Sequence, residues 1–186
     1  DEEEVAMELQ ETAEEKMTAA YDNLMENFSS LRTGKPSPKM LDKVNVDYYG
    51  APCALNQLAT VSVPDGSTIV VTPFDKSSIG DIEKALLQAD LGMTPNSDGT
   101  VVRLPVPPLT QERRKEYAKQ AAKFSEECKV AIRNARRDSI KGIEKLKSLS
   151  KDLVKDLTDG VQTTTDSYVA KVDDATKVKQ EDIMSV

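Results

Sequence analysis

Apolar residues recur along the chain with two different periods. Over residues 2–31, from 110 to about 149 and from about 150 towards the C-terminus, they return at every third or fourth position. That spacing gathers them on one face of a helix and predicts three long helices. Between residues 36 and 108 apolar and polar residues alternate in short runs instead, which is typical of half-buried strands.

Each long segment carries one apolar stripe. The first stripe is Leu9, Ala13, Met17, Ala20, Leu24, Phe28 and Leu31. The second is Tyr117, Ala121, Phe124, Cys128, Ile132, Ala135, Ile143 and Leu146, and the third is Leu153, Leu157, Val161, Tyr168, Val172 and Ala175. A single amphipathic helix cannot bury its stripe alone, so three such helices most simply form a bundle. Thr110 is the expected N-cap of the second long helix.

The middle segment predicts a small α+β fold. Its β-branched runs predict strands over 44–48, 61–63, 68–72 and 101–104, separated by turns at 49–52, 64–66 and 95–99. A short helix is expected after the third strand, with Ser77 or Ser78 as its N-cap and Gly92 at its end.

The order of these segments predicts an insertion. One helix precedes the α+β segment and two follow it, so we expect an α+β protein in which the segment is inserted into the bundle. Residues 1–32 and 108–186 are expected to form the elongated three-helix bundle, and residues 38–104 the inserted domain. Residues 33–37 and 105–107 are expected to form a two-strand hinge, with Thr33, Gly34, Pro105 and Pro107 as candidate hinge residues.

The composition narrows the possible chemistry. The chain has no histidine, which removes the commonest general base and the commonest metal ligand. Cys53 and Cys128 do not have the spacing of a metal site, and Cys128 lies on an apolar stripe. No apolar run approaches the roughly 18 residues of a membrane span. We therefore expect no enzyme, no cofactor, no metal site and no membrane association.

A nucleotide-binding loop is not expected either. Thr33-Gly34-Lys35 resembles the end of a phosphate-binding loop, but Ser29 takes the place of its first glycine. Pro36 replaces the hydroxyl residue, and a helix rather than a strand precedes the segment.

Charge is distributed unevenly along the chain. The net charge is −7, and residues 1–31 hold 10 acidic residues and one basic residue. Residues 105–149 hold 12 basic and 6 acidic residues. The average charge therefore hides one basic segment, which coincides with the second long helix.

Four basic residues of this helix form a candidate binding surface. Lys129, Arg133, Arg136 and Arg137 fall within roughly one quarter of the helix circumference, and few acidic residues stand near them in the sequence. Unpaired guanidinium groups match the geometry of phosphate oxygens, so we favour binding to nucleic acid. The low aromatic content of 4% favours contact with a folded backbone over base stacking. Two alternatives stay open: a solvated charged face, and a helical adaptor that binds protein partners.

Several motifs, spread in order over nearly the whole chain, resemble one known family, the ribosome recycling factors. They are Leu31-Arg32-Thr33-Gly34-Lys35-Pro36-Ser37-Pro38, Asp47-Tyr48-Tyr49-Gly50, Phe74-Asp75-Lys76-Ser77, Asp90-Leu91-Gly92-Met93-Thr94-Pro95-Asn96, Pro107-Pro108-Leu109-Thr110-Gln111-Glu112-Arg113-Arg114-Lys115 and Val130-Ala131-Ile132-Arg133-Asn134-Ala135-Arg136-Arg137-Asp138.

The resemblance implies a non-enzymatic translation factor, L-shaped and similar in size to a transfer RNA. Such a factor binds the large ribosomal subunit after termination and, with elongation factor G and GTP, helps to split the ribosome into subunits. The inserted domain would be the moving part. Carried over by position, contacts to large-subunit ribosomal RNA fall on Arg133, Arg136, Arg137, Arg32, Lys35, Arg113 and Arg114. Lys35 departs from the family pattern, in which arginine is common, and lysine lacks the forked donor geometry.

Some segments look most like plastid members of the family, among them Val63-Pro64-Asp65-Gly66-Ser67 and Asp75-Lys76-Ser77-Ser78. The first residue is not methionine, which suits a removed transit peptide. We therefore expect a monomer of the plastid stroma (chloroplast), with the bacterial cytoplasm as the alternative.

Overall fold

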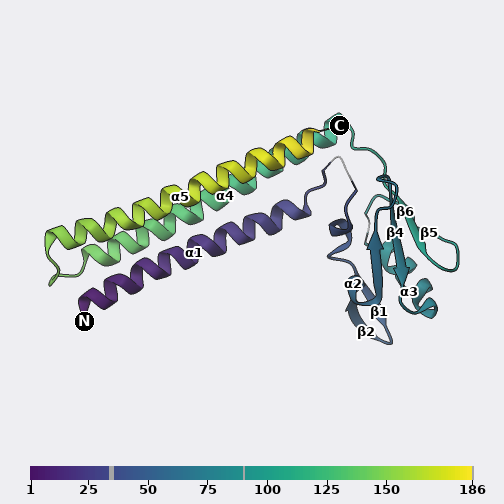
Figure 1. Cartoon of the computed structure of the whole chain (residues 1–186), viewed down its shortest axis with the longest axis horizontal. Helices are drawn as coiled ribbons and strands as arrows, with labels where there is room; N and C mark the ends of the chain where they lie inside the picture. Colours follow the sequence, from purple (N-terminus) through teal and green to yellow (C-terminus); the bar gives the residue numbers. More distant parts are fainter. Residues whose placement is uncertain (34–35, 90, 186) are drawn as a thin grey trace. The chain divides into compact units, whose positions relative to one another are not determined.

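The computed structural model describes residues 1–33, 36–89 and 91–185, and the chain divides into two compact units (Figure 1). One unit comprises residues 1–31 and 115–183. The other comprises residues 32–114 and 184–186. Each unit has its own hydrophobic core, so each is described separately.

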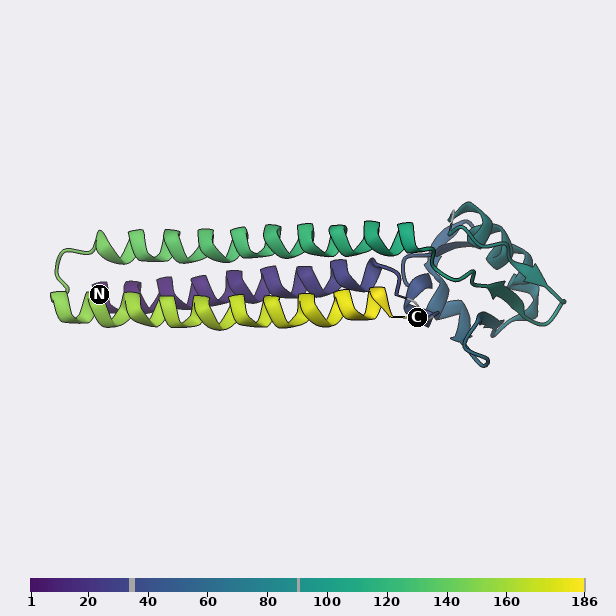
Figure 2. The ribbon, with the colours of Figure 1, turned by 90° about the horizontal axis from the view of Figure 1, so that it is seen from above.

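Three long helices make up the first unit, as the apolar stripes predicted. They are α1 (Glu2–Ser30), α4 (Gln111–Glu144) and α5 (Lys151–Met184), and they lie side by side (Figure 2). At 34 residues each, α4 and α5 extend for about 50 Å at 1.5 Å per residue. No helix in the described part of the chain combines the length and the apolar character needed to cross a membrane.

Side chains satisfy the free backbone N–H groups at the starts of these helices. Asp1 and Glu4 form a reciprocal capping box at the start of α1. The Thr110 hydroxyl accepts a hydrogen bond from the backbone N–H of Arg113, at 3.2 Å, which confirms Thr110 as the cap of α4. The Ser150 hydroxyl accepts from the Leu153 N–H at 3.1 Å and does the same for α5.

The bundle core follows the three stripes and is joined by a few polar contacts. Met17, Ile132 and Val172, one from each helix, are fully buried. The Ser139 hydroxyl donates to the Leu9 carbonyl at 3.0 Å, and the Gln10 amide donates to the Leu157 carbonyl at 2.8 Å. These two contacts tie α1 to α4 and to α5, and they help to set the register between the helices.

The second unit is a small α+β fold. Its elements are a 3-10 turn (Pro38–Leu41), β1 (Asn45–Tyr48), β2 (Ala51–Ala54), α2 (Leu55–Leu58), β3 (Ala59–Ser62), β4 (Thr68–Pro73), a 3-10 turn (Lys76–Ser78), α3 (Ile79–Gln88), β5 (Asn96–Ser97) and β6 (Val102–Pro105). β1 and β2 form an antiparallel hairpin, and the other strands form an antiparallel sheet in the order β3-β4-β6-β5. Helix α3 packs against β1, β5 and β6, over a core that includes Val46, Leu55, Ile69, Ile82 and Leu104.

Two short strands differ from the predicted turns. The segment 49–52 was expected to be a turn throughout, but only Tyr49 and Gly50, both with positive φ, make the turn, and Ala51 already belongs to β2. β5 likewise lies inside the turn expected at 95–99. Neither strand shows the apolar alternation on which the prediction depended, because both are exposed or only partly buried along their length.

The short helix begins as predicted after Ser78, which occupies its N-cap position, but it ends earlier than predicted. Neither Ser77 nor Ser78 caps it through its side chain. Instead, the Asp75 carboxylate accepts from the Ser77 N–H at 3.0 Å and starts the 3-10 turn that leads into α3. Helix α3 ends at Gln88, before the expected end at Gly92.

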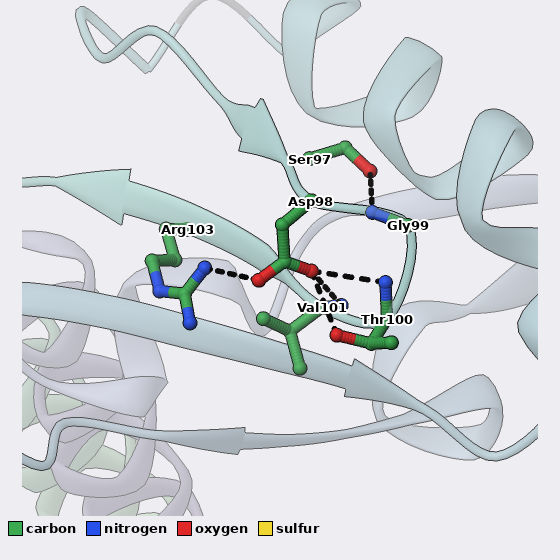
Figure 3. Close-up of polar contacts among 6 residues, drawn as sticks. All are labelled: Ser97, Asp98, Gly99, Thr100, Val101 and Arg103. Carbon is green, nitrogen blue, oxygen red and sulfur yellow. Dashed lines mark hydrogen bonds and ion pairs between the residues drawn. The ribbon is translucent and has the colours of Figure 1, made fainter.

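One carboxylate organises the turn between β5 and β6. Asp98 accepts hydrogen bonds from the backbone N–H groups of Thr100 and Val101, each at 2.9 Å, and from the Arg103 guanidinium (Figure 3). These donors hold the pKa of Asp98 well below its usual range, with the backbone hydrogen bond from Val101 as the largest cause. The turn is therefore closed by an ionised carboxylate.

Candidate nucleic-acid interface

The four basic residues of the expected binding face do not share one environment. Arg133 and Arg137 are exposed on α4, whereas Lys129 and Arg136 are partly buried. Because all four lie on one helix, the difference must come from the neighbouring helix. Helix α5 supplies it.

Lys129 is held by carboxylates and is not unpaired as predicted. Its ammonium group forms an ion pair with Asp173 of α5 and a longer one, 3.8 Å, with Glu126 of α4. Its side chain is only 16% exposed. The expectation of an unpaired basic face is therefore wrong at Lys129. Near neighbours in sequence could not reveal a partner that belongs to another helix.

Arg136 also faces α5, through a neutral partner. Its guanidinium donates to Oε1 of Gln162 at 3.4 Å, and Nε2 of Gln162 donates to Asp166 at 2.9 Å. The second contact orients the Gln162 amide, so that its oxygen faces the arginine. Arg136 thus shares one donor with α5, and its partner there is uncharged.

Arg133 and Arg137 occupy the outer flank of α4. They stand four residues apart, about one helical turn and 6 Å along the axis. Within the described residues, neither forms an ion pair or a hydrogen bond through its side chain. Two adjacent guanidinium groups without a counter-charge form a surface suited to phosphate oxygens.

The remaining arginines of the predicted set lie near the ends of the helices. Arg32 donates to the carbonyl of Pro107, which joins the two segments expected to form the hinge. Arg113 is exposed, and its backbone N–H is bonded to Thr110. Arg114 is only 8% exposed and donates to the Met184 carbonyl at 3.4 Å. Arg114 therefore faces the C-terminal end of α5 and does not present its charge to solvent.

The four candidate hinge residues do not share one setting. Pro105 is the last residue of β6 and pairs with Thr68 across the sheet, so it belongs to the folded unit. The next residue, Val106, donates its N–H to the Ser67 carbonyl at 3.0 Å. Thr33 and Pro107 lie outside regular secondary structure, while Gly34 and Lys35 lie outside the described residues.

Among the residues that the structure describes, no group of three or more histidine, cysteine, aspartate or glutamate residues could hold a metal ion. The pKa of the Cys128 thiol is raised by burial, which favours the neutral form. Its sulfur lies against the Ala20 carbonyl at 3.4 Å, so Cys128 acts as a packing residue between α1 and α4.

Comparison with known proteins identifies the family. Residues 24–184 match the family model described as ribosome recycling factor. The chain belongs to the ribosome recycling factor family. Its members are translation factors rather than enzymes, and they act on the ribosome.

A plastid relative and a bacterial relative have similar sequence identity to this chain. The chloroplastic ribosome-recycling factor of Daucus carota is 48% identical over 96% of this chain and 80% of its own length. The factor of Bacillus velezensis is 50% identical over 92% of this chain and 93% of its own length. Because the two identities are so similar, the plastid source stays a prediction.

A solved structure supports the fold. The solution structure of a ribosome recycling factor matches with a TM-score of 0.82 and 34% identity, and the match covers 97% of this chain and 98% of that chain. The predicted α+β class, a long helical bundle with an inserted sheet domain, is confirmed.

Proposed function

We propose that this protein binds large-subunit ribosomal RNA through the outer flank of α4 and, with elongation factor G and GTP, promotes dissociation of the post-termination ribosome. The observation that carries the proposal is the pair Arg133 and Arg137, exposed and without a counter-charge among the described residues. Phosphate groups are the most abundant partners for such a pair on a ribosome.

A second structural relative supports the choice of partners. Models of the T. thermophilus ribosome recycling factor and the E. coli elongation factor G, bound to the E. coli post-termination complex, include a chain that is 37% identical to this one. The TM-score is 0.66, over 97% of this chain. We transfer the ribosome and the elongation factor to this chain as proposed partners on that basis.

The basic residues are proposed to contribute unequally to phosphate binding, because their environments differ. Arg133 and Arg137 are proposed as the main phosphate contacts, because no hydrogen bond or ion pair with a described residue occupies their guanidinium donors. Arg136 is a secondary contact, because Gln162 already occupies one donor. Lys129 is proposed to link α4 to α5 through its ion pair with Asp173, because that carboxylate neutralises its charge.

The two units receive different proposed roles. The bundle anchors the protein on the ribosome, and the α+β unit moves when the elongation factor acts on it. Thr33 and Pro107, with Gly34 and Lys35, form the proposed hinge, and Arg32 links its two strands through the Pro107 carbonyl. The proposed location is the plastid stroma, because the carrot relative is named as chloroplastic.

The proposal is tested by the salt dependence of binding to purified E. coli large ribosomal subunits. Arg133→Ala and Arg137→Ala should each weaken binding and reduce the slope of log Kd against log salt by about one unit per lost phosphate contact. Lys177→Ala, which removes an exposed charge from α5, is the matched control and should leave the slope unchanged.

Subunit splitting provides the second measurement. Sucrose-gradient analysis with elongation factor G and GTP should show dissociation with the wild-type protein and less with the arginine variants. If both arginine variants bind like the wild type, the alternative of a helical adaptor that binds protein partners is favoured. If the wild-type protein causes no splitting at any concentration, the proposed recycling function is wrong.

A further inference from the structure

Two uncharged residues share the outer flank of α4 with the arginine pair. Val130 is 51% exposed, and Asn134 is also exposed. At 3.6 residues per turn, Val130 lies about 20° from Arg137 around the helix, and Asn134 about 40° beyond Val130. Val130, Arg133, Asn134 and Arg137 therefore form one continuous patch, here called the outer-flank patch.

The positions of neighbouring residues define the limits of this patch. Lys129 precedes Val130 by one residue, yet its side chain runs to Asp173 of α5. Arg136 precedes Arg137 by one residue and runs to Gln162 of α5. On the other side of the helix, Ile132 and Ala135 are buried in the bundle core. The outer-flank patch is therefore bounded on one side by residues that contact α5, and the bundle core lies on the opposite side of α4.

A single exposed valine on a protein surface needs no functional explanation. Here, however, Val130 stands three and seven residues before the two arginines and four before an asparagine. The patch thus combines two cations, an amide that can both donate and accept, and a small apolar surface. These match the parts of an RNA backbone, which are its phosphates, its 2′-hydroxyl groups and the apolar faces of its riboses.

We propose that Val130 and Asn134 are RNA-contact residues of the outer-flank patch, with Val130 packed on a ribose and Asn134 hydrogen-bonded to a 2′-hydroxyl. This inference rests on the proposed function and adds to it two uncharged contact residues and the RNA groups that they bind. The wide, shallow minor groove of a double-helical RNA displays its 2′-hydroxyls, so a rigid helix surface can reach them.

The aromatic residues of the described chain indicate whether the patch suits paired or unpaired RNA. Reading of unpaired bases uses aromatic side chains as stacking platforms. The large exposed aromatic residues of the described chain, Tyr49 and Phe74, belong to the α+β unit and not to α4. The outer-flank patch therefore fits the backbone of a folded RNA helix.

Two conservative variants test this inference. Val130→Thr keeps the β-branched shape and exchanges one methyl group for a hydroxyl. Asn134→Ala removes the amide and raises helix propensity, so weaker binding could not result from a weaker helix. The matched controls are Val178→Thr, at a valine of α5 that is 57% exposed, and Asn23→Ala, at an exposed asparagine of α1.

Binding to purified E. coli large ribosomal subunits is measured for all four variants over a range of salt concentrations. We expect Val130→Thr and Asn134→Ala to raise Kd by about threefold to tenfold, as for the loss of one apolar contact or one hydrogen bond. The slope of log Kd against log salt should stay at the wild-type value, because no phosphate contact is lost. The two control variants should bind like the wild type. Thermal unfolding should show that all four variants are folded, with the two asparagine variants at least as stable as the wild type.

The possible outcomes separate this inference from the proposed function. If the arginine variants bind weakly while Val130→Thr and Asn134→Ala bind like the wild type, the RNA site stands and the inference is overturned. A changed salt slope for Asn134→Ala, or equal losses in the control variants, would also overturn it. If the arginine variants bind normally, the RNA site itself is wrong and the inference fails with it.

Discussion

Replacing Gly142 by alanine measures how closely α1 approaches α4. A Cβ atom at Gly142 would lie 2.9 Å from Cδ1 and 3.1 Å from Cδ2 of Leu9. Favourable carbon contacts lie at about 3.5–4.0 Å, so the Leu9 side chain would have to move by roughly half an ångström. Overfilling a packed contact costs about 1–3 kcal/mol, whereas alanine is favoured over glycine inside a helix by about 1 kcal/mol. We expect Gly142→Ala to lower the free energy of unfolding by up to about 2 kcal/mol.

A second substitution reveals the cause. With Leu9→Ala the obstacle is absent, so Gly142→Ala should then raise the free energy of unfolding by up to about 1 kcal/mol. The effect of one substitution thus changes sign in the background of the other. Gly160→Ala in α5 is the comparison. Its new Cβ would lie 3.0 Å from Nε2 of Gln10, which donates to the Leu157 carbonyl, and not against Leu9, so its effect should be the same in both backgrounds.

Urea unfolding followed by far-UV circular dichroism gives the required free energies, because most of the signal comes from the three long helices. The decisive quantity is the difference between the effects of Gly142→Ala in the wild-type protein and in the Leu9→Ala variant. Equal effects in these two backgrounds would refute the close approach of α1 at this point. The subunit-binding assay is not needed for this test.

Two further predictions concern charged groups. Asp98 has a lowered pKa in the folded protein, so its contribution to stability is present above the unfolded pKa of about 3.9 and is lost as the pH falls below it. Asp98→Asn should therefore unfold at lower urea than the wild type at neutral pH, with the difference shrinking in acid; a difference independent of pH would contradict this. Lys129→Met should change stability by less than about 1 kcal/mol, because Asp173 is 56% exposed. It should also leave the salt slope of subunit binding unchanged, and a loss of one unit would make Lys129 a phosphate contact.

The long helices could be predicted because their stripes alone determine which face is buried. Met17, Ile132 and Val172 stand on three different stripes and are all fully buried. The second long helix was predicted to end near residue 149, but α4 ends at Glu144. Leu146 and Leu149 continue the helical spacing beyond Glu144, and both pack against a buried cluster at that end of the bundle although they lie in the turn. The apolar spacing therefore predicted burial correctly at these two positions, but not a helix.

The sequence predicted which residues of the candidate site share one face of α4, but not which residues of α5 contact them. The spacing of Arg133 and Arg137 places them on one flank of α4, and the structure leaves them exposed. The partners of Lys129 and Arg136 come from α5, where Asp173 and Gln162 follow them by 44 and 26 residues. Nothing local in the sequence connects such residues, because their contact depends on the register between two helices.

The division of the chain also determines the order in which the protein can fold during synthesis. The α+β unit is almost continuous in sequence, from residue 32 to 114, so it can fold as soon as it has emerged. Helix α1 emerges first, but its partners end about 150 residues later, at residue 183. At 5–20 residues per second, the apolar stripe of α1 has no partner for roughly eight to thirty seconds. The acidic residues of α1 give this helix a strongly negative net charge, and such a charge favours solubility over association while the apolar stripe has no partner.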